Sequence, residues 1–250
     1  MKYSICVPIQ VKSVEIKEIT SLIKEVTNLN PNFIELRLDY INDHESITKD
    51  FLQYLINLIQ PKIPVICTLR DSTEGGQITI EREESLKILK LIIEAKPKFI
   101  DIETNTEKEI LGEVVYLATQ NKIDLIFSYH NFSETPTYTE ANNLIETFLN
   151  KLNGEMGLTP QTIENSIFKL IFTAQTFEDN LVPLRLCKKR SSKKFRLISF
   201  CMGDAGLFSR IFCNFSGSVL TYCSYKDKTA PGQININKLR NTLKLLNFRT

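Results

Sequence analysis

The chain of 250 residues lacks any apolar run long enough to cross a bilayer, and its N-terminus lacks the pattern of a secretory signal peptide. It also lacks a strong charge excess, because the formal net charge is only +2. This balance gives no indication of binding to nucleic acid or to an acidic membrane surface. We therefore expect a soluble cytoplasmic protein. A plastid protein whose transit peptide has been removed is the alternative.

Cysteine and histidine are too sparsely placed to predict a metal site. No two of the six cysteines form a C-x-x-C pair, and neither histidine has a second histidine or a cysteine at ligand spacing. Several cysteines lie in apolar segments, which is typical of buried thiols in a reducing compartment. His44 lies in a polar segment and is expected at the surface.

Short apolar segments alternate with longer amphipathic segments along the whole chain. The short segments predict strands at Ser4–Ile9, Phe33–Asp39, Pro64–Arg70, Phe99–Glu103, Ile123–His130, Ser166–Thr173, Phe195–Cys201 and Ser218–Cys223. The long segments predict helices at Val14–Leu29, Thr48–Ile59, Ile80–Ala95, Glu107–Gln120, Thr139–Leu152, Thr176–Lys188, Gly206–Asn214 and Ile236–Leu246. About eight such units in 250 residues match a (β/α)8 TIM barrel, an α/β fold with a parallel sheet.

We predict this barrel as a single domain over residues 1–250. The alternative is an open doubly wound sheet, which usually has a glycine-rich turn after its first strand, whereas Gln10-Val11-Lys12 contains no glycine. The long connection Asn153–Asn165 is expected to form a lid, a short extra helix or a decorated loop. The basic run Lys188–Arg190 with Lys193-Lys194 is expected to be a solvated helix end.

One lysine lies in the middle of the apolar strand 166–173. Ile167, Lys169 and Ile171 share one face of this strand. Burial lowers the pKa of an amine, and a neutral amine is a nucleophile that forms Schiff bases with ketones. The alternative is a lysine on an edge strand whose amine extends to water.

Polar side chains also gather at the ends of several predicted strands. Within each strand they share a face: Glu35 with Arg37 and Asp39, Thr68 with Arg70, Asp101 with Glu103, and Ser128 with His130. Catalytic groups of such barrels lie at the C-terminal ends of the strands. We therefore predict one polar cavity lined by Glu35, Arg37, Arg70, His130 and Lys169, with a buried Glu–Arg ion pair as the structural alternative. Histidine titrates near neutral pH, so His130 suits proton transfer.

Two glycine-containing segments suggest an anion site. Met202–Gly206 follows the seventh predicted strand and opens a helix that carries Ser209 and Arg210, and Thr229–Gln233 follows the eighth strand. The loops after strands seven and eight are the usual anion site of these barrels. A helix N-terminus with an arginine fork suits a carboxylate or a phosphate.

The segments that carry this chemistry follow one another across essentially the whole chain. They are Glu35–Asp39, Thr68–Arg70 with Glu74-Gly75-Gly76, Asp101–Glu103, Ser128–Phe132, the strand around Lys169, Met202-Gly203 through Ser209-Arg210, and Ala230–Gln233. In this order they resemble the type I 3-dehydroquinate dehydratase family. The first strand and the ending Leu246–Arg249 are most similar to the dehydratase half of the plant-type bifunctional enzyme. A shikimate dehydrogenase domain follows there, and this chain stops near that junction.

The resemblance implies a lyase of the shikimate pathway that converts 3-dehydroquinate, a small-molecule substrate, to 3-dehydroshikimate and water without a cofactor. It implies that Lys169 forms the Schiff base and that His130, oriented by Glu74, transfers the protons. It further implies hydroxyl-binding residues Glu35, Arg37 and Arg70, and residues Arg210, Thr229, Gln233 and Met202 around the substrate carboxylate and ring. A homodimer is also implied.

Two other functions stay open at this point. A class I aldolase also forms a lysine Schiff base, but on a phosphorylated sugar, and would need a phosphate site. A barrel that binds a carboxylate without turnover is the other alternative, against which the lysine and histidine argue. Asn153–Asn165 makes the separation of His130 and Lys169 longer than is usual in the family, and Thr229 stands where serine is more common.

Overall fold

The computed structural model describes residues 3–77, 79–155 and 158–246. The chain divides into two units, residues 6–126 and residues 1–5 with 127–250, and each unit is described by itself. Part of the connection Asn153–Asn165 and most of the ending Leu246–Arg249 lie outside the described residues. One domain over residues 1–250 stays a prediction.

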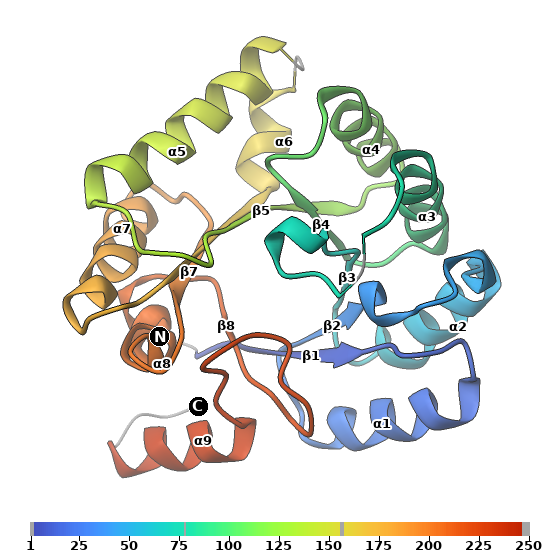
Figure 1. Ribbon diagram of the computed structural model, residues 1–250, viewed down its shortest axis with the longest axis horizontal. Helices are drawn as coiled ribbons and strands as arrows, with labels where there is room; N and C mark the ends of the chain where they lie inside the picture. Colours follow the sequence, from blue (N-terminus) through green and yellow to red (C-terminus); the bar gives the residue numbers. More distant parts are fainter. Residues whose placement is uncertain (1–2, 78, 156–157, 247–250) are drawn as a thin grey trace. The chain divides into compact units, whose positions relative to one another are not determined.

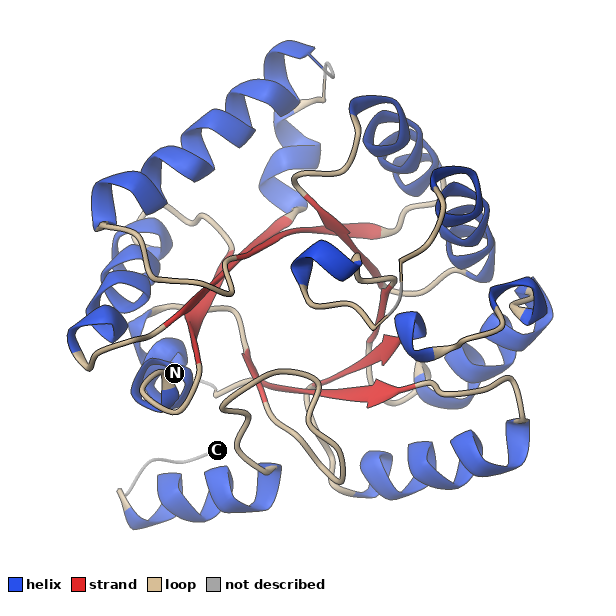
Figure 2. Cartoon of the chain, in the orientation of Figure 1, coloured by secondary structure: helices blue, strands red, loops and turns tan. Residues whose placement is uncertain are grey.

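The strands are β1 (Ile5–Gln10), β2 (Phe33–Arg37), β3 (Val65–Thr68), β4 (Phe99–Glu103), β5 (Asp124–His130), β6 (Ile167–Thr173), β7 (Leu197–Met202) and β8 (Thr221–Tyr222). They form one eight-stranded sheet in the order β7-β6-β5-β4-β3-β2-β1-β8. Helices alternate with these strands along the chain (Figure 1, Figure 2). The structure confirms the predicted α/β TIM barrel.

The unit of residues 6–126 places a row of polar residues near the ends of its strands. Its helices are α1 (Ile16–Asn28), α2 (Lys49–Ile59), α3 (Arg82–Ala95) and α4 (Lys108–Gln120), with the 3-10 helices η1 (Leu38–Tyr40), η2 (His44–Ser46) and η3 (Ser72–Glu74). In the parallel pairs β2–β3 and β3–β4, Arg37 lies opposite Thr68, and Thr68 lies opposite Asp101. The register therefore sets these three side chains on one face of the sheet.

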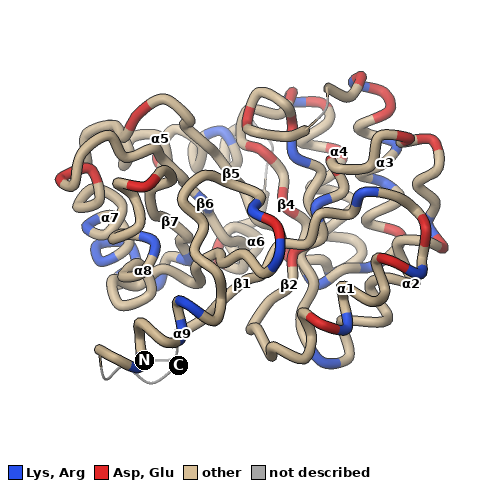
Figure 3. The backbone as a smooth tube through the Cα atoms, turned by 60° about the horizontal axis from the view of Figure 1, so that its bottom comes forward, with Lys and Arg blue, Asp and Glu red and all other residues tan. Residues whose placement is uncertain are grey.

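The surface of this unit mixes charges of both signs. Figure 3 shows Lys or Arg and Asp or Glu along α3 and α4. Two exposed pairs join these helices, Lys90 Nζ with Glu113 Oε1 and Arg82 Nη1 with Glu107 Oε2, each at 2.6 Å. Exposed pairs of this kind contribute at most about 1 kcal/mol each.

The other unit is organised around the pair β6–β7. Its helices are α5 (Tyr138–Asn150), α6 (Pro160–Asn165), α7 (Leu181–Ser191), α8 (Leu207–Ser216) and α9 (Ile236–Leu245), with a π-helix η4 (Lys151–Glu155) and a 3-10 helix η5 (Glu178–Asn180). Helices α7 and α8 contact β7 and each other (Figure 1). The backbone N–H of Val219 donates to Leu197 O, and that of Thr221 donates to Ser4 O, so the segment around β8 is bonded on both sides.

Alternation along β6 sends Phe168 and Lys169 to opposite faces of the sheet. The Phe168 ring packs against Phe127, Phe148 and Phe195, with ring centroids 5.6, 6.1 and 4.7 Å away. This aromatic cluster fixes which face of β6 is covered by apolar side chains. Lys169 is consequently directed to the other face.

Two strands end earlier than the sequence predicts. β2 ends at Arg37, and Asp39 lies in η1, so Asp39 does not share a strand face with Glu35 and Arg37. Residues two apart on a strand are separated by about 6.6 Å. The 3-10 turn instead brings Asp39 back to chelate the Arg37 guanidinium. β3 ends at Thr68, so Arg70 lies in the loop that follows.

Two polar residues that the sequence places in solvent are less exposed than expected. Lys188 and Lys189 are exposed, as the solvated-end prediction requires, but Arg190 is buried. Arg190 Nη2 donates to Asn142 Oδ1 and Glu146 Oε1, each at 2.8 Å, so burial is offset by two polar partners from α5. The His44 side chain is 10% exposed, with Nδ1 4.0 Å from Glu84 Oε2, so this histidine is half-buried rather than fully exposed.

The remaining features agree with the sequence. The described part of the connection Asn153–Asn165 holds the end of η4 and α6, so of the three expected forms the short extra helix is the one found. All six cysteines lie in the described ranges, and each is a buried thiol outside any disulfide. Among the described helices, none has both the length and the apolar character needed to cross a membrane.

Candidate active site

Lys169 is a buried lysine on an internal strand. The residue is only 5% exposed, and its Nζ lies 4.6 Å from the centroid of the Tyr222 ring on β8. β7 pairs with one side of β6, and the Asn131 N–H donates to Ile171 O on the other side. The alternative of an edge-strand lysine reaching water is therefore wrong.

Arg210, on α8, is a buried guanidinium with no carboxylate partner among the described residues. Its Nη2 donates to Pro231 O at 3.1 Å, its Nη1 lies 3.5 Å from Tyr222 O, and its Nε has no hydrogen-bond partner in the described structure. Burial lowers the pKa of Arg210 to about 10, so the group stays charged at neutral pH. A buried cation without an internal counter-ion suits an anion that a ligand brings.

Tyr222 joins the amine to this anion site. Its ring faces Lys169 Nζ, and its backbone carbonyl contacts Arg210. Met202 ends β7 opposite Thr173 of β6 and is buried on the Lys169 face. The structure therefore places Lys169 and Arg210 in contact with the same residue, Tyr222, and Met202 on the same sheet face as Lys169.

Thr229 and Gln233 are held to each other in the loop after β8. Gln233 Nε2 donates to Thr229 Oγ1 at 3.0 Å, and the Thr229 N–H donates to Gln233 Oε1 at 2.8 Å. Gly232 in the same loop has φ +69°, and a Cβ there would lie 2.2 Å from Gly203 O in the loop after β7. The two loops thus approach so closely that only glycine fits.

Replacing Gly232 with alanine is expected to destabilise the protein by about 2–4 kcal/mol, because it combines a left-handed backbone with overpacking. Chemical denaturation with the midpoint as readout measures this loss. Gly154→Ala is the matched control, since a Cβ at Gly154 meets nothing within 4 Å. Equal midpoints for both variants would contradict the close approach.

His130 ends β5 and is half-buried, beside Phe132 at a ring-centroid distance of 6.5 Å. The next residue, Asn131, donates its N–H to Ile171 O at 2.8 Å. Ile171 lies two residues beyond Lys169 on the same face of β6. This backbone bond sets the end of the histidine strand beside the lysine strand.

In the other unit, the predicted site residues form hydrogen bonds with neighbouring polar side chains. Glu35 is buried and accepts a hydrogen bond from Thr68 Oγ1 at 2.9 Å. Arg37 donates through Nε and Nη2 to the two oxygens of Asp39, each at 2.8 Å. Burial by itself would lower the pKa of Arg37, but the hydrogen bond to Asp39 raises it above its ordinary value.

Arg70 is clamped by two carboxylates to which the sequence analysis gave no role. Its Nη2 donates to Asp101 Oδ1 at 2.8 Å, and its Nη1 donates to Glu103 Oε1 at 2.5 Å. Burial opposes the charge of Arg70, but Asp101 and Glu103 raise its pKa well above the usual value. Burial also raises the pKa of Glu103. The sequence shows these two carboxylates on one face at the end of β4, but it does not give Arg70 as their partner.

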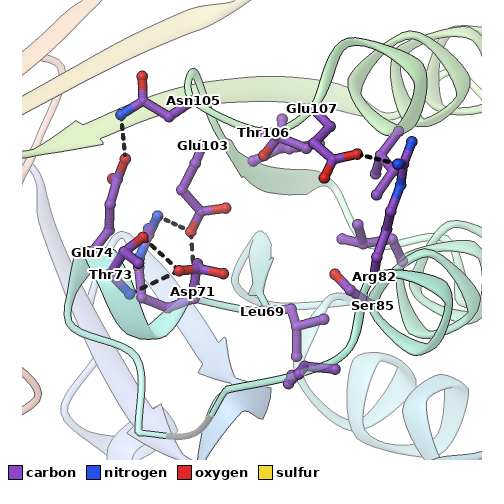
Figure 4. Close-up of a pocket in the computed structure, with 15 residues that line it drawn as sticks. Leu69, Asp71, Thr73, Glu74, Arg82, Ser85, Glu103, Asn105, Thr106 and Glu107 are labelled. Carbon is purple, nitrogen blue, oxygen red and sulfur yellow. Dashed lines mark hydrogen bonds and ion pairs between the residues drawn. The ribbon is translucent and has the colours of Figure 1, made fainter.

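Glu74 lies in η3 and is buried beside a cavity of about 280 Å³. Figure 4 shows Asn105 donating to its carboxylate, with Nδ2 3.2 Å from Oε1. Gly75 follows with φ 84°, and a Cβ on Gly76 would lie 2.0 Å from Arg70 O. The two glycines therefore allow the tight turn that presents Glu74, and Asn105 is a second contact that sequence reasoning missed.

Each unit thus assembles its own set of predicted residues. One set supplies an amine, an imidazole and a guanidinium that suits an anion, and the other supplies paired carboxylates and guanidiniums. That both sets line one cavity stays a prediction. Within the described part of the chain, no group of histidine, cysteine, aspartate or glutamate could hold a metal ion.

Comparison with known proteins decides the family. The family model described as Type I 3-dehydroquinase matches residues 5–249. The chain belongs to this family. The resemblance read from the motifs is thereby confirmed.

Relatives of this type I 3-dehydroquinase align with the chain over most of their length. The 3-dehydroquinate dehydratase of Methanococcus maripaludis is 32% identical over 246 residues, which cover 97% of this chain and 100% of the relative. That of Pyrococcus abyssi is 30% identical and covers 91% of this chain and 94% of the relative. These archaeal relatives give the plastid alternative no support.

Solved structures show the same fold. The type I 3-dehydroquinate dehydratase of Clostridium difficile, which carries covalently modified comenic acid, has a TM-score of 0.81 and 30% identity, covering 98% of this chain and 92% of that chain. The dehydroquinate dehydratase and shikimate dehydrogenase of S. pombe, at 23% identity and a TM-score of 0.75, covers 100% of this chain and 45% of that chain. The latter likeness shows the fold alone.

Proposed function

We propose that this chain dehydrates 3-dehydroquinate to 3-dehydroshikimate, a step of the shikimate pathway that leads to aromatic amino acids, through a Schiff base on Lys169. One observation carries the proposal: in a member of this family, a buried lysine lies beside Tyr222, whose carbonyl contacts a buried arginine that lacks a carboxylate partner among the described residues. A ketone acid offers the carbonyl carbon to the amine and the carboxylate to the guanidinium.

The first step forms an imine. The amine nitrogen bonds to the ketone carbon, and the ketone oxygen leaves as water after the nitrogen gives up a proton and a second proton is taken from the medium. The nitrogen stays in the bond as a positively charged iminium. This charge acidifies the neighbouring C–H bond, so a side-chain base suffices for its removal.

His130 then moves the proton. It takes a proton from the carbon next to the iminium, which gives an enamine, and returns it to the departing hydroxyl, which leaves as water. Hydrolysis of the conjugated iminium releases 3-dehydroshikimate and regenerates the lysine. Glu74 orients His130 in this proposal, and no metal ion or organic cofactor is needed.

The other predicted residues fix the substrate. Arg210, Thr229 and Gln233 bind its carboxylate, and Met202 packs over the ring. We propose that Glu35, Arg37 and Arg70 bind the ring hydroxyls of the same molecule. Fixing the ring in this way presents both the proton and the leaving hydroxyl to one imidazole.

Incubation with 3-dehydroquinate and borohydride tests the proposal. Borohydride reduces the iminium to a stable amine, and mass spectrometry of the digested protein is expected to show the added mass on Lys169. An adduct formed only with a phosphorylated sugar ketone would instead support the aldolase alternative. If no adduct forms and no turnover occurs with any of these ketones, the enzyme proposal is overturned and a carboxylate-binding barrel is the function that remains.

Replacing Arg210 with methionine is expected to raise the KM for 3-dehydroquinate by about 10²-fold, because a charge-assisted bidentate contact is worth roughly 3 kcal/mol. Arg185→Met, an exposed arginine on α7, is the matched control. Since Arg210 also bonds the Pro231 carbonyl, Arg210→Lys serves as a second variant that keeps the charge. A KM unchanged in Arg210→Met would remove the carboxylate role.

We further propose that the enzyme acts in the cytoplasm. The homodimer implied by the resemblance, and a fused shikimate dehydrogenase domain in a longer form, also stay predictions. Light scattering of the purified chain measures its molar mass and so tests the homodimer directly.

A further inference from the structure

Phe200 and Tyr222 form a buried aromatic pair on neighbouring strands. Their ring centroids lie 6.3 Å apart at 52°, with Phe200 on β7 and Tyr222 on β8. Lys169 lies opposite Ile198, which is two residues before Phe200 and therefore on the same face of β7. The aromatic pair thus stands on the lysine face of the sheet.

Each ring of the aromatic pair faces one basic side chain. The Arg210 guanidinium carbon lies 4.5 Å from the Phe200 centroid, and Lys169 Nζ lies 4.6 Å from the Tyr222 centroid. The faces of aromatic rings carry negative electrostatic potential and attract cations within about 6 Å. Both side chains are buried, and loss of hydration strengthens the attraction of a ring face for a positive charge.

The guanidinium on Phe200 is held differently from those in the other unit. Arg37 and Arg70 are neutralised by carboxylates that occupy their N–H donors. Arg210, by contrast, contacts a ring face and two backbone carbonyls. A ring stabilises the charge without accepting hydrogen bonds in the guanidinium plane, so the donors stay available to a carboxylate that arrives with the substrate.

We propose that the aromatic pair is the electrostatic support of this site: Phe200 positions Arg210 in its charged form for the substrate carboxylate, and Tyr222 stabilises the positive nitrogen of the Lys169 iminium. This inference rests on the proposed function. The iminium is the species that acidifies the neighbouring C–H bond, so Tyr222 acts on the chemical step. Phe200 acts on binding.

Because Tyr222 acts on the chemical step and Phe200 acts on binding, substitutions of Tyr222 are expected to change kcat and substitutions of Phe200 to change KM. Tyr222→Leu removes the ring face and is expected to lower kcat about tenfold, while KM changes less than about twofold. Tyr222→Phe keeps the face and is expected to retain kcat. Phe200→Leu is expected to raise KM about tenfold with kcat nearly unchanged. Phe200→Tyr keeps an aromatic ring at this position and is expected to keep the wild-type KM.

Fluorinated phenylalanines at position 222 separate electrostatics from packing. Successive fluorine atoms weaken the negative potential of the ring face with little change in its volume. In the full chain, kcat is expected to fall stepwise from Tyr222→Phe through the mono-, di- and trifluorinated variants. A ring that only fills space would give the same kcat throughout the series.

The outcomes distinguish this inference from the function on which it rests. A wild-type chain with neither turnover nor a borohydride adduct overturns the proposed function. A wild-type chain that turns over, with kcat unchanged in Tyr222→Leu and across the fluorinated series, overturns the role of Tyr222. An unchanged KM in Phe200→Leu overturns the role of Phe200.

Discussion

Lys169→Ala is expected to lower kcat by about 10⁴-fold or more and to eliminate the borohydride adduct. Removing a covalent nucleophile closes the imine route and leaves only what the rest of the site can do. Lys169→Arg is expected to be equally inactive, because it keeps a cation beside Tyr222 but cannot form an imine. Stopped assays with excess enzyme and mass spectrometry of the trapped protein measure both losses.

Lys188→Ala is the matched control for these variants, since Lys188 is an exposed lysine of the same unit, on α7. It is expected to keep the wild-type kcat and the adduct. Substantial turnover in Lys169→Ala, or an adduct that maps to a different lysine, would show that the buried amine is not the nucleophile.

His130→Ala is expected to lower kcat by about 10²–10⁴-fold while the borohydride adduct still forms. A positioned proton-transfer group contributes about this factor, whereas imine formation depends on the amine, which this variant keeps. The adduct yield against time and the steady-state kcat are measured on the same preparation. Loss of turnover with retention of the adduct places His130 after imine formation.

His44→Ala is the matched control, because the chain has only two histidines. His44 lies in η2, with Nδ1 4.0 Å from Glu84 Oε2 on α3, and its removal is expected to leave kcat unchanged. Wild-type activity in His130→Ala would contradict the assignment of the base. Loss of the adduct in that variant would show that His130 is also needed to form the imine.

The buried guanidinium groups of the two units differ in how their charge is offset. Arg70 is held by Asp101 and Glu103, which fix its direction and offset its burial. Arg210 has no such carboxylate among the described residues. The proposed substrate carries one carboxylate and several neutral hydroxyls, so we expect a guanidinium without a counter-ion to suit the acid and a neutralised one to suit hydroxyls.

The sequence by itself determined the sheet and the family, and it singled out Lys169 as the candidate nucleophile. Alternating apolar and amphipathic segments fix strands and helices through their side-chain periods, whereas the position of Lys169 within its strand left burial and an edge position that reaches water both open. The motifs that follow one another from Glu35–Asp39 to Ala230–Gln233 were together sufficient to identify the family that the comparisons confirm.

Only the tertiary structure decided which residues become neighbours across strands and loops. Periodicity gives the face on which a side chain lies, but it does not give the partner from a distant segment. The contacts of Tyr222 with Lys169 and Arg210, the clamp on Arg70, and the burial of Arg190 all join segments far apart in the chain. The contact of Tyr222 with Lys169 depends on strand register, because a shift of one residue would turn a strand side chain to the opposite face. The clamp on Arg70 depends on the path of a loop, and the burial of Arg190 depends on how α7 packs.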